Sequence, residues 1–146
     1  MTKFVMISFI SSRLKKAPWV DEAHWQEHLV GSRNKLQRYY EAKIAADQVL
    51  YEEGRKRKDF AAICLRPATL TAEPAGKVSL GKFPKVEGVS SRASVAHLAA
   101  LLLDAPNIKS CWLDMLDGGE DPEAAVRRCV EEGVDSVEGE PFAEEP

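Results

Sequence analysis

Three short apolar runs, separated by longer segments of helical pattern, constrain the fold of this 146-residue chain most strongly. The runs occupy residues 3–9 (K-F-V-M-I-S-F), 60–66 (F-A-A-I-C-L-R) and 111–116 (C-W-L-D-M-L). Each has almost no alternation of polar and apolar residues, which is typical of strands that are buried on both faces of a parallel sheet.

In the segments between these runs, apolar residues recur at the spacing of one helix face. Residues 33–53 carry apolar side chains at helical intervals, and we expect a long helix that is capped by Ser32 and ends at Gly54. Shorter helices are expected over 21–30, 90–103 and 121–133. The order strand, helix, strand, helix, strand, helix predicts an α/β fold with about three parallel strands and flanking helices.

Two further segments have no clear periodicity. Residues 68–90 are rich in proline and glycine and are predicted to be a loop. Residues 134–146 hold five acidic residues and no basic one, so we expect a disordered acidic tail after a single domain over 1–133.

Composition excludes several classes of function. The net charge is -3, and the short basic clusters at 15–16 and 55–58 have acidic neighbours, so we expect no nucleic-acid partner. No apolar run reaches the roughly 18 residues of a membrane span. Three widely spaced cysteines without a C-x-x-C pair indicate free thiols in a reducing compartment, and we therefore expect a cytoplasmic protein.

His24 and His28 are four residues apart in the stretch H-W-Q-E-H. Two histidines at this spacing on one helix could ligate zinc, but the protease motif needs glutamate directly after the first histidine, where this chain has Trp25. No third ligand is evident, so we expect an ordinary surface helix and no metal.

The stretch R-Y-Y-E-A-K places Tyr39 four residues before Lys43. On a helix these side chains lie on one face, and a nearby ammonium group favours phenolate and lowers the pKa of tyrosine. Such a tyrosine can exchange a proton with a carbonyl oxygen. The same spacing also fits an ordinary amphipathic helix whose tyrosine points its hydroxyl into solvent.

Five blocks of the sequence follow one another over residues 3–132: K-F-V-M-I-S, R-Y-Y-E-A-K-I-A-A-D, L-R-P-A-T-L-T-A-E-P-A-G-K-V, V-S-S-R-A-S-V-A and L-D-M-L-D-G-G-E-D-P-E-A-A. In their residues, order and spacing, these blocks resemble the short-chain dehydrogenase/reductases, in particular their atypical NAD(P)-binding, epimerase-like branch.

The resemblance implies an NAD(P)-dependent oxidoreductase or epimerase. Tyr39 would be its acid/base, Lys43 would lower the pKa of Tyr39 and hold the ribose hydroxyls, and Ser8 would orient the carbonyl, with Ser11 and Ser12 as alternatives. The segment bordering the nicotinamide would comprise Pro67, Ala68, Thr69, Leu70 and Thr71.

The main departure from the family pattern concerns its first half. The family's first four strands are absent, and no G-x-x-G-x-x-G segment is present to bind a dinucleotide pyrophosphate. Ala68 replaces a glycine and Ser94 an aspartate. We therefore expect part of a Rossmann-like NAD(P)-binding domain, incomplete and weakly active or inactive alone. The alternatives are a non-catalytic remnant that acts through a protein partner and an incomplete gene model of a full enzyme.

Without the first half, the strand at 3–9 would lie at an open edge of the sheet. Such an edge is usually protected by lysine, proline or a bulge, and here only Lys3 is available. We expect self-association or pairing with a second polypeptide along this edge.

Overall fold

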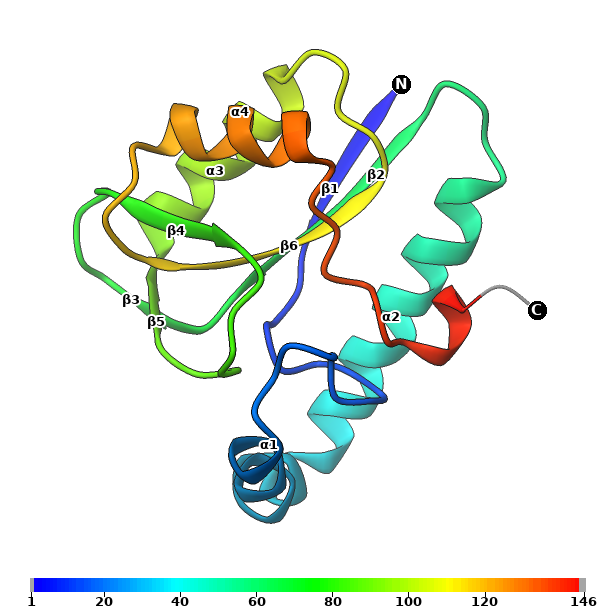
Figure 1. Cartoon of the computed structure of the whole chain (residues 1–146), viewed down its shortest axis with the longest axis vertical. Coiled ribbons are helices and arrows are strands. Elements are labelled where there is room, and N and C mark those ends of the chain that lie inside the picture. Colours follow the sequence, from blue (N-terminus) through cyan, green and yellow to red (C-terminus); the bar gives the residue numbers. More distant parts are fainter. Residues whose placement is uncertain (1, 145–146) are drawn as a thin grey trace.

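The computed structural model describes residues 2–144 and shows a sheet covered by helices on both faces (Figure 1). The strands of the main sheet lie in the order β1 (Lys3–Ile7), β2 (Ala61–Pro67), β6 (Cys111–Asp117) and β4 (Val78–Gly81). β1, β2 and β6 are parallel, and β4 is antiparallel to β6. The predicted α/β fold with three parallel strands is confirmed.

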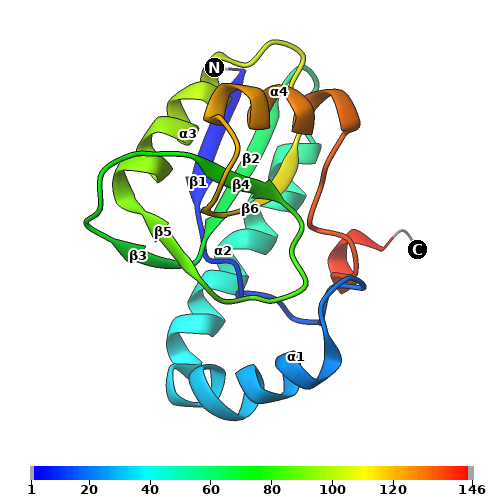
Figure 2. The same cartoon turned by 60° about the vertical axis from the view of Figure 1, so that its left-hand side comes forward.

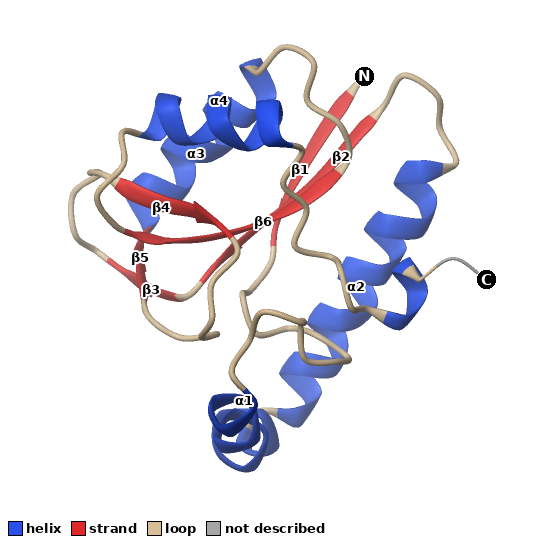
Figure 3. Cartoon of the chain, viewed as in Figure 1, coloured by secondary structure: helices blue, strands red, loops and turns tan. Residues whose placement is uncertain are grey.

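The helical segments are α1 (Glu22–His28), a π-helical turn over 29–33, α2 (Gln37–Arg55), α3 (Arg92–Asp104), α4 (Pro122–Glu132) and a 3-10 turn (Pro141–Ala143). The longer helices α2, α3 and α4 form two layers on the sheet. α2 covers one face of the sheet, whereas α3 and α4 cover the other (Figures 1 and 3). α1 lies beyond the carboxyl ends of β1 and β2, away from α3 and α4 (Figure 2).

Successive side chains of β2 point to opposite faces of the sheet, and both faces are buried, so the strand is a continuous apolar run in the sequence. Ile63 and Leu65 pack into the cluster shared with α3 and α4, while Cys64 packs on the opposite face with Trp112. All seven residues of β2 are buried, as expected for a central strand with helices on both sides.

Two of the predicted helix ends are wrong. The chain is already helical from Glu22 through Arg33, so Ser32 does not stand at a helix start, and α2 begins after Leu36 without a side-chain cap. Gly54 lies inside α2, which continues to Arg55. The ends of α3 and α4 follow the sequence signals: Ser91 and Asp121 accept the capping hydrogen bonds, and Gly133 has a φ of 63°.

Gly54 is needed for a close approach rather than for a helix end. A Cβ atom at this position would lie 2.3 Å from the Cβ of Ala62 on β2. We therefore expect Gly54→Ala to lower the free energy of unfolding by about 1–3 kcal/mol, because helix and strand must separate. Gly119→Ala is the control, since a Cβ there meets nothing within 4 Å. Equal denaturant midpoints for the two variants would contradict this account.

The region 68–90, predicted to be a loop, contains short strands. β3 (Thr69–Thr71) pairs in parallel with β5 (Val89–Ser91), and β4 extends the main sheet. Strands of three or four residues are too short to show a periodicity. Within the described residues, no helix is long and apolar enough to cross a membrane.

The expected disordered tail is instead packed on the domain over residues 134–144. Ser136 and Glu140 are fully buried. Arg13 donates hydrogen bonds to the carbonyls of Ser136 and Glu138, and the Glu140 carboxylate accepts the backbone N–H groups of Leu14 and Lys15. The acidic composition predicted disorder, but these hydrogen bonds hold the segment on the domain. Residues 145–146 lie outside the described residues.

Within residues 2–144, β1 forms the edge of the main sheet and pairs only with β2. Lys3 does not protect this edge, because its ammonium group donates to the carbonyls of Leu103 and Ala105 at the end of α3. Phe4 and Ile7 are 44% and 37% exposed. One row of backbone groups therefore remains open beside apolar side chains.

Candidate functional site

A cavity of about 220 Å³ lies beyond the carboxyl ends of β1 and β2, and we call it the Tyr40 cavity. Its polar lining comes from five separate segments: Ser11 after β1, the α1 and π-helical region, Tyr40 on α2, Thr69 after β2, and Glu87 before β5. In α/β proteins ligands commonly bind at this end of a parallel sheet. The Tyr40 cavity is therefore the candidate functional site.

Ser11 and Tyr40 form the central polar pair of this cavity. Their hydroxyl oxygens are 3.0 Å apart, and Tyr40 is only 2% exposed. The ring of Tyr40 packs against Phe9 and His28. The sequence motif indicated Tyr39, the residue before Tyr40. The helical spacing of apolar residues could have predicted that Tyr40 is buried, but not that it contacts Ser11.

Tyr39 and Lys43 lie beside the cavity and do not line it. Tyr39 is 45% exposed and its ring meets the rings of Phe9 and Tyr40 edge-on. The Lys43 ammonium group lies over the face of the Tyr39 ring, 5.8 Å from its centroid. Burial, followed by the charges of Tyr40 and Asp47, raises the pKa of Tyr39. The expected lowering by Lys43 is wrong for this arrangement, and the phenol is held in its protonated form.

The three candidate serines have different surroundings. The Ser8 hydroxyl lies 3.1 Å from that of Ser12, which in turn donates to Asp47 Oδ2 at 2.7 Å. Ser8 and Ser12 are thus part of a buried network, and Ser11 alone of the three contacts a tyrosine hydroxyl.

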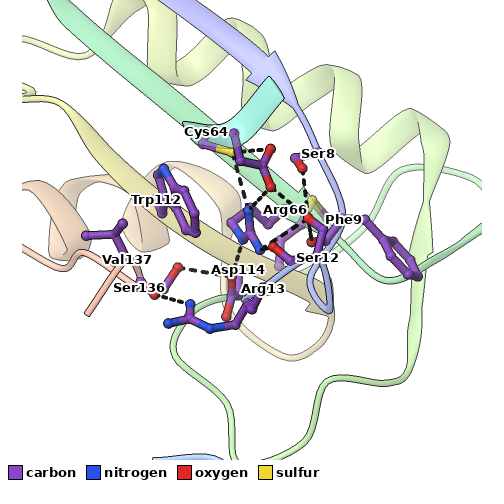
Figure 4. A network of polar contacts seen from close by, with 12 residues as sticks. Ser8, Phe9, Ser12, Arg13, Cys64, Arg66, Trp112, Asp114, Ser136 and Val137 are labelled. Atoms are coloured by element: carbon purple, nitrogen blue, oxygen red, sulfur yellow. Dashed lines mark hydrogen bonds and ion pairs between the residues drawn. The ribbon is translucent and has the colours of Figure 1, made fainter. Parts of the chain in front are cut away.

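This network centres on the guanidinium group of Arg66, which is completely buried (Figure 4). Arg66 donates to Asp47 Oδ2 at 2.8 Å and to the Ser12 carbonyl at 2.7 Å, and its Nε lies 3.3 Å from Asp114 Oδ1. The guanidinium also stacks on Trp112 at 4.1 Å. The network joins α2 and the segment after β1 to the centre of the sheet.

A second arginine extends the network to the carboxyl-terminal segment. Arg13 lies 3.6 Å from Glu140, and Ser136 donates to Asp114 at 3.0 Å. Two guanidinium groups therefore face three buried carboxyl groups, those of Asp47, Asp114 and Glu140. Burial raises the pKa of Asp114 to about 6, although the guanidinium groups of Arg66 and Arg13 act in the opposite direction.

The predicted nicotinamide-bordering segment follows β2 directly. Pro67 and Ala68 are buried, and the Ala68 N–H donates to the Ser90 hydroxyl at 3.0 Å. Thr69, Leu70 and Thr71 form β3, with Leu70 40% exposed. Ala68 and Thr69 border the Tyr40 cavity, so the structure brings the start of this segment to Ser11 and Tyr40.

His24 and His28 lie on α1 and line the Tyr40 cavity, so the prediction of an ordinary surface helix is wrong. His24 Nε2 accepts the Val86 N–H at 3.0 Å, and its Nδ1 lies 3.9 Å from Glu87. Among the described residues no group of three or more His, Cys, Asp or Glu side chains could hold a metal ion. The cysteines Cys64, Cys111 and Cys129 are buried and unpaired.

Solved structures show the same fold at low sequence identity. The chain is similar to the oxidoreductase ylbE from Lactococcus lactis (21% identity, TM-score 0.68, 90% of this chain and 53% of that one). It is also similar to a Bacillus halodurans protein described as an NAD-dependent epimerase/dehydratase (22%, TM-score 0.62, 87% and 51%) and to chuY from E. coli CFT073 (16%, TM-score 0.56, 84% and 60%). The chain spans about half the length of the first two.

No curated protein sequence matches the chain. A family model described as NAD(P)H-binding matches residues 1–106, which include β1, α2, β2 and α3 together with all the residues that surround the Tyr40 cavity. The match covers well over half of the chain and agrees with the observed fold. The chain therefore belongs to the NAD(P)H-binding family.

Proposed function

We propose that the chain carries the substrate side of an NAD(P)-dependent oxidoreductase of the atypical short-chain dehydrogenase type. The observation that supports this function best is the Ser11–Tyr40 hydroxyl pair in a cavity at the carboxyl ends of β1 and β2, with Tyr39 and Lys43 directly beside it. The Ser11 and Tyr40 hydroxyl groups can hold a carbonyl oxygen, and a phenol beside them can deliver a proton to it.

In this proposal Tyr39 is the proton donor. Its raised pKa keeps the phenol protonated at neutral pH, which suits carbonyl reduction better than the reverse reaction. Lys43, which lies over the Tyr39 ring, would hold a ribose hydroxyl. Ser11, rather than Ser8, is the serine whose hydroxyl faces a tyrosine at the cavity.

The residues present fit the nicotinamide end of an NAD(P) molecule and not its pyrophosphate. The nicotinamide would supply a hydride when bound, and the exposed side chains of Tyr39 and Leu70, with the half-buried Lys43, are available to border it. No G-x-x-G-x-x-G segment occurs in the sequence. Contacts to the pyrophosphate would therefore have to come from outside these 146 residues, and the chain alone should bind and turn over weakly.

The experiment that tests this function is an assay of NADPH oxidation at millimolar NADPH with a panel of small aldehydes and ketones. We expect slow turnover above the rate without protein. A rate equal to that blank with every carbonyl compound would contradict the proposal.

The open edge at β1 favours the second candidate function, action through a protein partner. Its unpaired backbone groups and the exposed side chains of Phe4 and Ile7 form a surface on which another strand can pair. We expect the chain to self-associate, or to pair with a second polypeptide, along residues 3–9.

Light scattering over a series of concentrations measures this association. The mean mass should rise with concentration, and Ile7→Lys should reduce the rise, because a charge on the edge opposes pairing. Leu70→Lys is a matched control at a similarly exposed residue away from β1. A monomer that persists at high concentration would contradict the prediction.

A further inference from the structure

His28 lines the Tyr40 cavity and carries an unused polar atom. Its Nε2 is buried and has no hydrogen-bond partner among residues 2–144. Ring contacts with Trp25 at 5.3 Å and Tyr40 at 5.4 Å fix the orientation of the imidazole. A buried polar atom without a partner is costly, and a ligand that bonds to it removes this cost.

The histidine is uncharged at neutral pH. Burial, with smaller effects from Arg33 and His24, lowers the pKa of His28 to about 4. A neutral imidazole offers one N–H donor and one acceptor nitrogen, and therefore can bond to a hydroxyl or a carbonyl group. His24 cannot share this role because its Nε2 is already bonded to Val86.

The Ser11–Tyr40 pair supplies the complementary group. Two hydroxyls share one hydrogen bond, so one O–H proton and several lone pairs remain for a ligand. The cavity thus presents donors and acceptors at two places, His28 and the hydroxyl pair. A ligand that fits both needs a carbonyl and a hydroxyl group.

Charge selects against anions. Glu27 and Glu87 line the cavity, and no lysine or arginine of the described residues does. Arg33 and Lys43 lie outside the lining, over the rings of Tyr40 and Tyr39. The charged side chains of the lining itself are therefore carboxylates, which disfavour carboxylate and phosphate ligands at its wall.

The volume limits the size of the ligand. At about 30 Å³ for each water-sized group, 220 Å³ accommodates only about seven such groups. We propose that the Tyr40 cavity binds a small neutral hydroxycarbonyl compound and that His28 determines this specificity; that the compound is also the substrate rests on the proposed function.

Hydroxyacetone and pyruvate are suitable probes, because they share a three-carbon ketone and differ only in a hydroxymethyl or a carboxylate group. Binding to the full chain at neutral pH is followed by ¹H–¹⁵N NMR. We expect hydroxyacetone to shift the amides of Ser11, His28 and Tyr40, with pyruvate binding at least about tenfold more weakly. Equal affinities, or shifts confined to other parts of the chain, would overturn the proposal.

Two variants test the roles of the imidazole and of the charges. His28→Phe keeps the ring contacts and removes both nitrogens, and should weaken hydroxyacetone binding about tenfold. His97→Phe, at an exposed residue of α3, is the matched control and should bind as the parent chain does. The Glu27→Gln/Glu87→Gln double variant should bring the affinity for pyruvate up to that for hydroxyacetone, and it decides the proposal if His28→Phe does not fold. Unchanged affinities would overturn the proposal.

Parallel NADPH oxidation assays separate this inference from the proposed function. Binding of hydroxyacetone that depends on His28, without NADPH oxidation, supports the cavity and contradicts the oxidoreductase. NADPH oxidation by a chain whose hydroxyacetone affinity does not change in His28→Phe supports the oxidoreductase and overturns the assignment of the cavity.

Discussion

Arg66→Met should lower the free energy of unfolding by about 3–5 kcal/mol, because it leaves buried carboxylates without their cation. The guanidinium group is completely buried, donates to Asp47 and the Ser12 carbonyl, and lies 3.3 Å from Asp114. Methionine keeps much of the volume against Trp112 but supplies no donor. A domain of this size has about 5–15 kcal/mol in total, so the loss removes a large part of it.

Thermal unfolding at pH 7 measures the effect, and we expect the midpoint to fall by roughly 10 °C or more. Lys82→Met is the control: Lys82 forms an ion pair with Glu138 at 3.2 Å, but both side chains are substantially exposed. Its effect should stay within about 0.5 kcal/mol. If Arg66→Met cost less than about 1 kcal/mol, the network would not hold the segments around it together.

The second large effect concerns the proton donor. Tyr39→Phe keeps the ring contacts with Phe9 and Tyr40 and removes only the hydroxyl. We expect the rate of NADPH-dependent carbonyl reduction to fall by about 10²–10⁴, the usual contribution of general acid catalysis. The thermal midpoint should change little, since the Tyr39 hydroxyl has no hydrogen-bond partner among residues 2–144.

Two other tyrosines of α2 serve as comparisons. Tyr51 packs against Phe142 and Arg55, away from the cavity, so Tyr51→Phe should leave the rate unchanged. Tyr40→Phe removes the bond to Ser11 and should mainly raise KM, by about tenfold. A large loss of kcat in Tyr40→Phe with normal kcat in Tyr39→Phe would reverse the two roles.

The central sheet could be predicted because its strands are buried on both faces. β2 packs against α3 and α4 with one set of side chains and against α2 with the other, and this requires the apolar run that the sequence shows. β3, β4 and β5 could not be predicted. Their three or four residues are held by partners in other parts of the chain, and not by a pattern of their own.

The site was only partly predictable for a similar reason. Adjacent residues on a helix point in directions about 100° apart, and packing against Phe9 and His28 decides that Tyr40 rather than Tyr39 enters the cavity. The carboxyl-terminal segment depends on Arg13 and on the N–H groups of Leu14 and Lys15, more than 100 residues away. Composition alone could not reveal partners at such a separation.

The location of NADPH on the chain tests the central claim most directly, that the residues beside the Tyr40 cavity face the nicotinamide. We predict binding in the millimolar range, about −4 kcal/mol, since the pyrophosphate finds no glycine-rich turn. In ¹H–¹⁵N NMR spectra, NADPH should shift the amides of Tyr39, Lys43, Thr69 and Leu70. Shifts confined to the hollow at the opposite end of the sheet, which Lys3, Arg55 and Lys109 line, would contradict the account; so would the absence of any shift at about 10 mM NADPH.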